Sequence, residues 1–164
     1  MSATKATDMP RIGEPDEILQ GANYSAVQLG ASGDWNRYAV RHPSLPTTIH
    51  GKVFLKGLLG LTGTEISCGV LPNRGAMPFL HAHRENEEVY VFVSGRGQML
   101  VDGEVFDVSE GSVVRIAPAG VRSWRSTSDE PLVYLVIQAK EGSLRQWTLT
   151  DGVGVAGAPV WPEN

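Results

Sequence analysis

Residues 75 to 95 of the chain read Gly75-Ala-Met-Pro-Phe-Leu-His81-Ala-His83-Arg-Glu-Asn-Glu-Glu88-Val-Tyr-Val-Phe-Val-Ser-Gly95. Two histidines that lie two positions apart on a strand point to the same face, because successive side chains alternate. A carboxylate on the returning strand can complete a metal-binding triad of two imidazoles and one carboxylate. The spacing therefore predicts a β-strand scaffold that presents a metal site.

The sequence around this stretch is typical of an all-β chain. From Thr64 onward, short β-rich runs alternate with turn signals, which predicts a sandwich or barrel. Asp102-Gly103 lies between two such runs and favours a type I′ hairpin, because both central residues of that turn need positive φ. The expected strands cover residues 64–71, 79–83, 88–94, 98–101, 104–108, 112–116, 121–125 and 132–139.

From about residue 64 to residue 140 the chain resembles the cupin family. The resemblance rests on the complete first cupin motif, from Gly75 to Gly95, and on the hairpin segment that follows it. It implies an all-β fold with a single double-stranded β-helix, which is a small jelly-roll barrel. We expect this barrel over residues 51–145, an irregular, loosely structured N-terminal arm over residues 1–50 with one strand near residues 25–29, and a C-terminal tail over residues 146–164.

The second cupin motif departs from the family pattern because its histidine is missing. Residues 111–126 contain no histidine, although Pro118 and Gly120 keep their places. A match on these two residues puts the missing histidine at Ser123, whereas an ungapped match from the start of the motif puts it at Arg122. Both assignments stay open at this point.

The resemblance implies that His81, His83 and Glu88 hold a divalent transition metal, such as Fe, Mn, Ni or Zn, without the family's fourth ligand. Such a triad leaves coordination positions for water, substrate or dioxygen. Alternation along the strand supports the choice of Glu88: if it faces inward, Tyr90 and Phe92 face inward too and form an apolar wall with one hydroxyl group.

Further candidate ligand contacts surround this triad. An arginine cannot ligate a metal, but it can hold a carboxylate or phosphate with two hydrogen bonds. Gln138 is polar in an otherwise apolar strand and needs a partner, which is either the ligand or a structural group. The predicted ligand-binding residues are Arg122, Ser123, Gln138, Phe92 and Trp124.

Composition excludes several other classes of function. The chain has 164 residues and a formal net charge of −4, and it contains no long basic cluster, so we expect no nucleic-acid partner. Its apolar runs are too short for a membrane span and the N-terminus lacks a secretory core, which favours the cytoplasm. The lone Cys68 excludes an intramolecular disulfide and is expected to be an inert, buried thiol.

These observations leave two functional hypotheses. The first is a cytoplasmic cupin that binds a small, anionic or oxygen-rich ligand at the metal. If that protein is an enzyme, the resemblance favours metal-assisted oxygenation, isomerisation or decarboxylation, with Tyr90 as the proton-transfer residue. The alternative is a metal-free module that senses or stores a metabolite held by Arg122 and Gln138. Because the N-terminal arm could cover a sheet edge of a second copy, we expect a homodimer.

Overall fold

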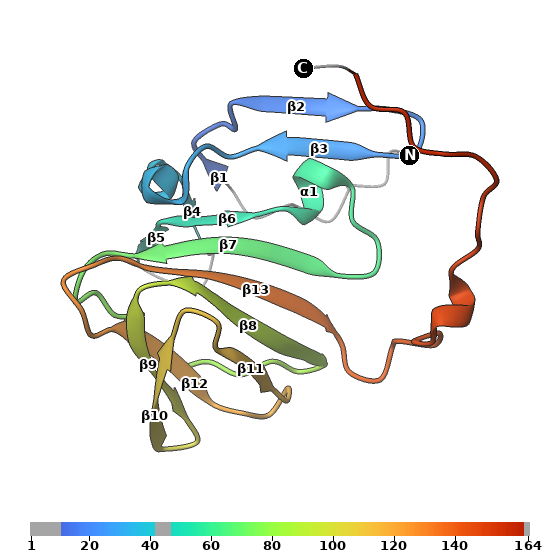
Figure 1. The fold of residues 1–164 in the computed structure, drawn as a ribbon. Coiled ribbons are helices and arrows are strands. Elements are labelled where there is room, and N and C mark those ends of the chain that lie inside the picture. The colour runs from blue at the N-terminus through green and yellow to red at the C-terminus, as the bar shows by residue number, and fades with distance from the viewer. Residues whose placement is uncertain (1–10, 42–46, 163–164) are drawn as a thin grey trace, which may run out of the picture.

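The computed structural model describes residues 11–41 and 47–162, and Figure 1 shows its two main sheets. The larger sheet has five strands in the order β11-β8-β13-β7-β6, and the smaller has three in the order β10-β9-β12. All neighbouring strands in both sheets are antiparallel. Their bounds are β6 Lys52–Phe54, β7 Glu65–Leu71, β8 Asn86–Ser94, β9 Arg96–Val101, β10 Glu104–Ser109, β11 Val113–Ile116, β12 Arg122–Ser126 and β13 Leu132–Lys140.

The inward faces of these two sheets bury the main core. Alternate residues of each strand point inward, as expected for a sheet with one buried face. This arrangement confirms the predicted all-β jelly-roll barrel. The buried core residues are Leu71, Met77, Tyr90, Phe92, Met99, Val108, Ile116, Trp124, Leu132, Tyr134 and Val136.

Seven of the eight expected runs form strands, and the exception is residues 79–83. There the chain makes only an isolated bridge, in which the backbone N–H groups of His81 and Arg122 each donate to the other's carbonyl, at 3.2 and 3.0 Å. Pro78 precedes this segment and has no N–H for a ladder hydrogen bond. The predicted hairpin turn is confirmed, because Asp102 and Gly103 have φ values of 51° and 89°.

The described part of residues 1–50 is more regular than predicted. It holds β1 Arg11–Ile12, the hairpin of β2 Glu17–Gln20 and β3 Ser25–Gln28, the 3₁₀ helix η1 Ser32–Arg37, β4 Ala39–Arg41 and β5 Thr48–His50. The strand expected near residues 25–29 is therefore confirmed. The prediction of a loosely structured arm was wrong for the described part of residues 1–50. Residues 1–10 and 42–46 of that arm lie outside the described residues.

A second buried cluster explains why these N-terminal residues are ordered. Tyr38 and Leu29 pack with Val53 and Cys68 on the face of β6 and β7 that points away from the main core. The short helix α1 Lys56–Leu59 adds Leu58 to this cluster. The N-terminal residues thus cover one face of the larger sheet. The division of the chain into an arm, a barrel and a tail stays a prediction.

The C-terminal residues 141–162 leave β13 and, as Figure 1 shows, run along one side of the molecule with one short 3₁₀ helix, η2 Leu149–Asp151. Their large apolar side chains are exposed, including Trp147 at 79% and Trp161 at 80%. Among the described residues, no helix is long and apolar enough to cross a membrane.

Candidate metal and ligand site

Strand β8 carries the carboxylate of the site, and its alternation follows the prediction. Glu88, Tyr90 and Phe92 are buried, with 4%, 0% and 1% of their surface exposed, while Val93 on the opposite face is 43% exposed. Glu87 also faces outward, where it forms an ion pair with Arg115 at 2.6 Å. Glu88 is therefore the inward carboxylate that the sequence predicted.

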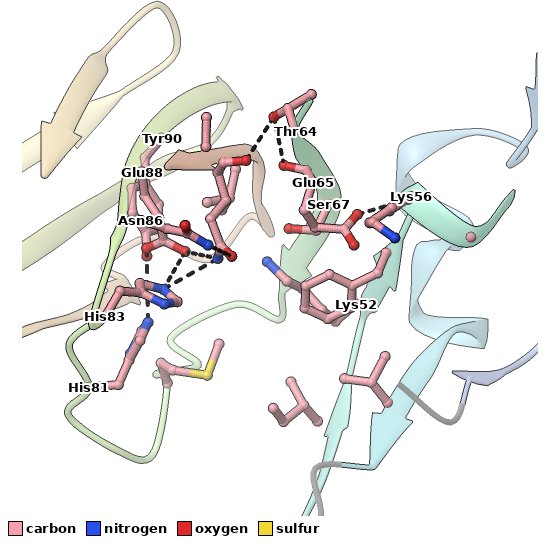
Figure 2. A pocket seen from close by; sticks show the side chains of 18 of the residues that line it. Lys52, Lys56, Thr64, Glu65, Ser67, His81, His83, Asn86, Glu88 and Tyr90 are labelled. Carbon is pink, nitrogen blue, oxygen red and sulfur yellow. Dashed lines mark hydrogen bonds and ion pairs between the residues drawn. The ribbon is translucent and has the colours of Figure 1, made fainter. Parts of the chain in front are cut away.

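His81 and His83 come from the loop before β8 and meet Glu88 inside the barrel (Figure 2). The Nε2 atom of His83 lies 3.0 Å from Glu88 Oε1, and that of His81 lies 4.0 Å from Glu88 Oε2. One donor atom from each residue can be chosen so that all three lie within 4.8 Å of one another. The backbone N–H of His83 donates to the Pro118 carbonyl at 2.9 Å, which anchors the loop.

Arg122 holds the other side of the Glu88 carboxylate. Its Nε and Nη2 atoms donate to Oε2 at 3.1 and 2.6 Å, and its Nη1 donates to the Gly120 carbonyl at 2.8 Å. The Tyr90 hydroxyl donates to the same Oε2 at 2.7 Å, and Gln138 Nε2 donates to Oε1 at 3.0 Å. Both oxygens of Glu88 are thus fixed by neighbouring donors.

Burial and these bonds set the protonation of the site. Burial opposes the charge on Glu88, yet hydrogen bonds from His83, Arg122 and Tyr90 hold the pKa of this carboxyl well below its usual range. Burial and the nearby Arg122 charge lower the pKa of His81 to about 4. Burial and the Glu88 charge raise the pKa of Tyr90 far above its usual range. At neutral pH His81 is neutral and Glu88 is ionised, the forms that metals bind.

Comparison with known proteins agrees with the jelly-roll fold. The cupin domain family model matches residues 69–138. A cupin protein from Bacteroides fragilis is 40% identical in sequence, superposes with a TM-score of 0.62, and is matched over 71% of this chain and 97% of its own length. The chain belongs to the cupin family.

Two further similar proteins give less information about this cupin. An uncharacterized protein from Methanocaldococcus jannaschii is 34% identical over 61 residues, which is 37% of this chain and 49% of that protein, so the chain spans about half the length of this curated relative. A putative sugar phosphate isomerase from Acidithiobacillus ferrooxidans is 23% identical with a TM-score of 0.50, over 54% of this chain and 58% of that one. This last likeness concerns the fold alone.

A cavity of about 1050 Å³ opens beside the triad of this cupin. Its apolar wall comes from β5, β6, the loop before β8, β12 and β13, and its polar groups gather around the triad and along β6 and β7. Its lining includes the triad itself and Lys52, Phe54, Met77, Phe79, Trp124, Val136 and Gln138.

The structure separates the predicted ligand contacts into two groups. Gln138 and Trp124 line the cavity, as expected. Arg122, Ser123 and Phe92 do not belong to the cavity wall, and ligand contact by the five residues stays a prediction. Arg122 is fully buried behind Glu88, and Phe92 packs in the core.

Ser123 lies on the opposite face of β12 from Arg122, and its hydroxyl donates to the Met77 carbonyl at 3.1 Å. Of the two candidate positions for the missing histidine, Arg122 is thus the one whose side chain reaches Glu88.

Two polar residues of the site were not predicted. Asn86 Nδ2 donates to Gln138 Oε1 at 2.9 Å and so fixes the amide that reaches Glu88. The same alternation that placed Glu88 and Tyr90 inward could have found Asn86, two positions before Glu88. Lys52 lines the cavity from β6, and nothing in the short run around it shows from sequence which face it takes.

Proposed function

We propose that this cupin binds a small, anionic or oxygen-rich molecule in the cavity, beside a divalent transition metal held by His81, His83 and Glu88. The observation that carries this proposal is the triad itself, whose donor atoms lie within 4.8 Å of one another at the wall of a cavity of about 1050 Å³. Two imidazoles and one carboxylate suit Fe, Mn, Ni or Zn. A bound ion would act as a Lewis acid or as a site for an oxygen ligand.

The residues around the triad position Glu88. Arg122 and Tyr90 hold its Oε2, so Oε1, next to His83 and Gln138, is the oxygen that would hold a metal. The proton of the Tyr90 hydroxyl is committed to Glu88 and the pKa of this tyrosine is raised, so we assign it a positioning role in place of proton transfer. Oxygenation, isomerisation and decarboxylation remain the reaction classes proposed for an enzyme of this kind.

A second candidate, a metal-free cupin that binds or senses a metabolite, is favoured by the Arg122–Glu88 ion pair. The guanidinium neutralises the carboxylate of the triad, and hydrogen bonds already engage both Glu88 oxygens. A divalent ion would have to replace the contacts at Oε1 and would meet no net negative charge from the triad and Arg122. Both features lower metal affinity relative to an unpaired carboxylate.

Metal analysis distinguishes the two candidates. The full chain is purified after growth with added Fe, Mn, Ni and Zn, and its metal content is compared with that of a His81→Ala/His83→Ala variant and of His50→Ala, which changes an exposed histidine on β5. About one metal per chain is expected in the wild type and in His50→Ala, and almost none in the double variant. Trace metal that is unchanged in the double variant would leave only the metal-free candidate.

Oxygen uptake then narrows the reaction class. A stoichiometric, redox-active metal that supports no oxygen consumption with small acids, diketones or phenols would argue against oxygenation. Isomerisation and decarboxylation would then be the remaining proposals for an enzyme.

We also propose that the protein is a homodimer, and the exposed C-terminal tail supports this. Trp147, Leu149 and Trp161 are at least 79% exposed, and so much exposed apolar surface favours a protein partner. Light scattering with and without residues 141–164 tests the proposal, and an unchanged mass would contradict a role for the tail. Removal of residues 1–50 is not a suitable test of the dimer, because it would also remove Tyr38 and Val40, which are buried in the fold. The cytoplasmic location stays a prediction.

A further inference from the structure

Lys52 is a lysine on the inner face of the barrel. In the strand register Lys52 of β6 pairs with Gly69 of β7, and Gly69 pairs with Tyr134 of β13. Paired residues of adjacent antiparallel strands project to the same face, so all three face the cavity side of the sheet. The neighbours Val53 and Cys68 project to the other face and join the second buried cluster. An amine thus lies on the mostly apolar, cavity-facing side of the sheet.

Gly69 allows an aromatic ring to hold this amine. A Cβ atom at Gly69 would lie 2.3 Å from the Tyr134 ring, so the ring occupies the space above the glycine. The Lys52 Nζ lies 5.0 Å from the centre of the Tyr134 ring and 5.6 Å from that of Phe54. Such cation–π contacts fix the position of an ammonium group without neutralising its charge.

The amine lacks an anionic partner in the described part of the chain. Lys52 is 7% exposed, and no hydrogen bond or ion pair joins its Nζ to another described residue. The two nearby carboxylates already have other partners. Glu88 forms an ion pair with Arg122, and Glu65 accepts hydrogen bonds from the backbone N–H groups of Leu55 and Lys56. A buried charge without a partner is costly, and burial lowers the pKa of Lys52 to about 8.

Figure 2 shows the Lys52 side chain reaching from β6 toward the side of the cavity that holds His83 and Glu88. We propose that Lys52 binds the carboxylate of an organic acid whose apolar body packs against Phe54, Phe79 and Val136. A monocarboxylate fits better than a phosphate, because Lys52 is the one buried cationic side chain of the cavity wall among the described residues. The inference rests on the proposed binding of a small molecule, but it does not require the metal.

Paired probes of equal shape test this assignment. Binding of benzoate and of neutral benzamide to the full chain is measured by calorimetry near pH 7, in the wild type, in Lys52→Met and in Lys56→Met. Lys56 is an exposed lysine at the cavity wall and serves as the matched control. We expect benzoate to bind at least about tenfold more tightly than benzamide in the wild type and in Lys56→Met, and this preference to vanish in Lys52→Met.

Three results would overturn the assignment: equal affinity for the two probes in the wild type, no saturable benzoate binding, or an unchanged preference in Lys52→Met. If Lys52→Met misfolds, a measurement on the wild type alone still tests the assignment. The ratio of benzoate affinity to benzamide affinity must fall as the pH rises through about 8, because Lys52 loses its charge there. Repetition with chelator separates the two proposals. A preference that survives metal removal supports Lys52 even if the metal site fails, whereas benzoate binding that needs metal but not Lys52 refutes this inference alone.

Discussion

Replacement of Lys52 by methionine is expected to stabilise the fold at neutral pH. Methionine keeps the length of the side chain and packs well against the Tyr134 and Phe54 rings, while it removes a buried charge that has no partner among the described residues. Most substitutions of buried residues destabilise a protein, so a gain here would be diagnostic.

The magnitude follows from the pKa of the lysine. Burial lowers it from 10.5 to about 8, and each pKa unit corresponds to about 1.4 kcal/mol, so the protonated amine costs about 3 kcal/mol in the folded state. Below pH 8 this cost is fully present. Between about pH 8 and 10.5 the unfolded chain binds a proton that the folded chain does not, so wild-type stability rises with pH through this window.

Titratable groups on β7 and β8 affect this comparison. Glu88 of β8 and Glu65 of β7 attract the ammonium, and the pKa of about 8 includes both effects. Cys68, also on β7, has its pKa raised to about 11 by burial, so its titration lowers stability at high pH. Because Cys68 titrates in both proteins, its contribution cancels in the difference between wild type and variant, apart from its charge interaction with Lys52.

Urea unfolding at several values between about pH 7 and 10.5, with chelator present, measures this difference. We expect Lys52→Met to be more stable by up to about 3 kcal/mol near pH 7, and the gain to disappear toward pH 10.5. Lys56→Met changes an exposed amine and should show neither effect. A variant that is less stable than wild type at pH 7, or a difference that does not change with pH, would refute the reasoning.

Two further predictions concern the groups that hold Glu88 and Lys52. Arg122→Met leaves the buried Glu88 charge without its guanidinium, so urea unfolding should show a loss of about 3 to 5 kcal/mol, part of which returns in Arg122→Met/Glu88→Gln; equal losses in the single and double variants would contradict the pairing. Gly69→Ala forces a Cβ atom against the buried Tyr134 ring, so we expect a loss of about 1 to 3 kcal/mol in thermal or urea unfolding, which Tyr134→Leu should relieve.

The sequence predicted the parts of the site that depend on local alternation. Once β8 is a strand, Glu88 and Tyr90 must share a face, and the structure buries both. The hairpin at Asp102-Gly103 was also predictable, because few dipeptides suit two successive positive φ values. Both predictions need only neighbouring residues.

The parts that were not predicted depend on contacts between distant residues. Strand β6 has three residues, too few for a period, and only its pairing with β7 turns Lys52 toward the cavity. The ordering of residues 11–41 has the same origin, since Tyr38 is buried by packing against residues such as Val53 and Cys68. The sequence left Arg122 and Ser123 both open as the substituted position, because the partner of Arg122 is Glu88, 34 residues away.

The ion pair of Arg122 with Glu88 changes the charge that a ligand meets. A neutral histidine at position 122 would leave the triad with the single negative charge of Glu88, which offsets part of the charge of a divalent ion. Arg122 cancels that charge, and Lys52 adds a positive charge that has no carboxylate partner within residues 11–41 and 47–162. The metal-free cavity therefore suits one carboxylate, whereas a metal-loaded cavity has a much larger positive charge and favours an acid with several anionic oxygens. The charge of the acid that binds most tightly, measured with and without chelator, thus reports whether the metal is part of the working site.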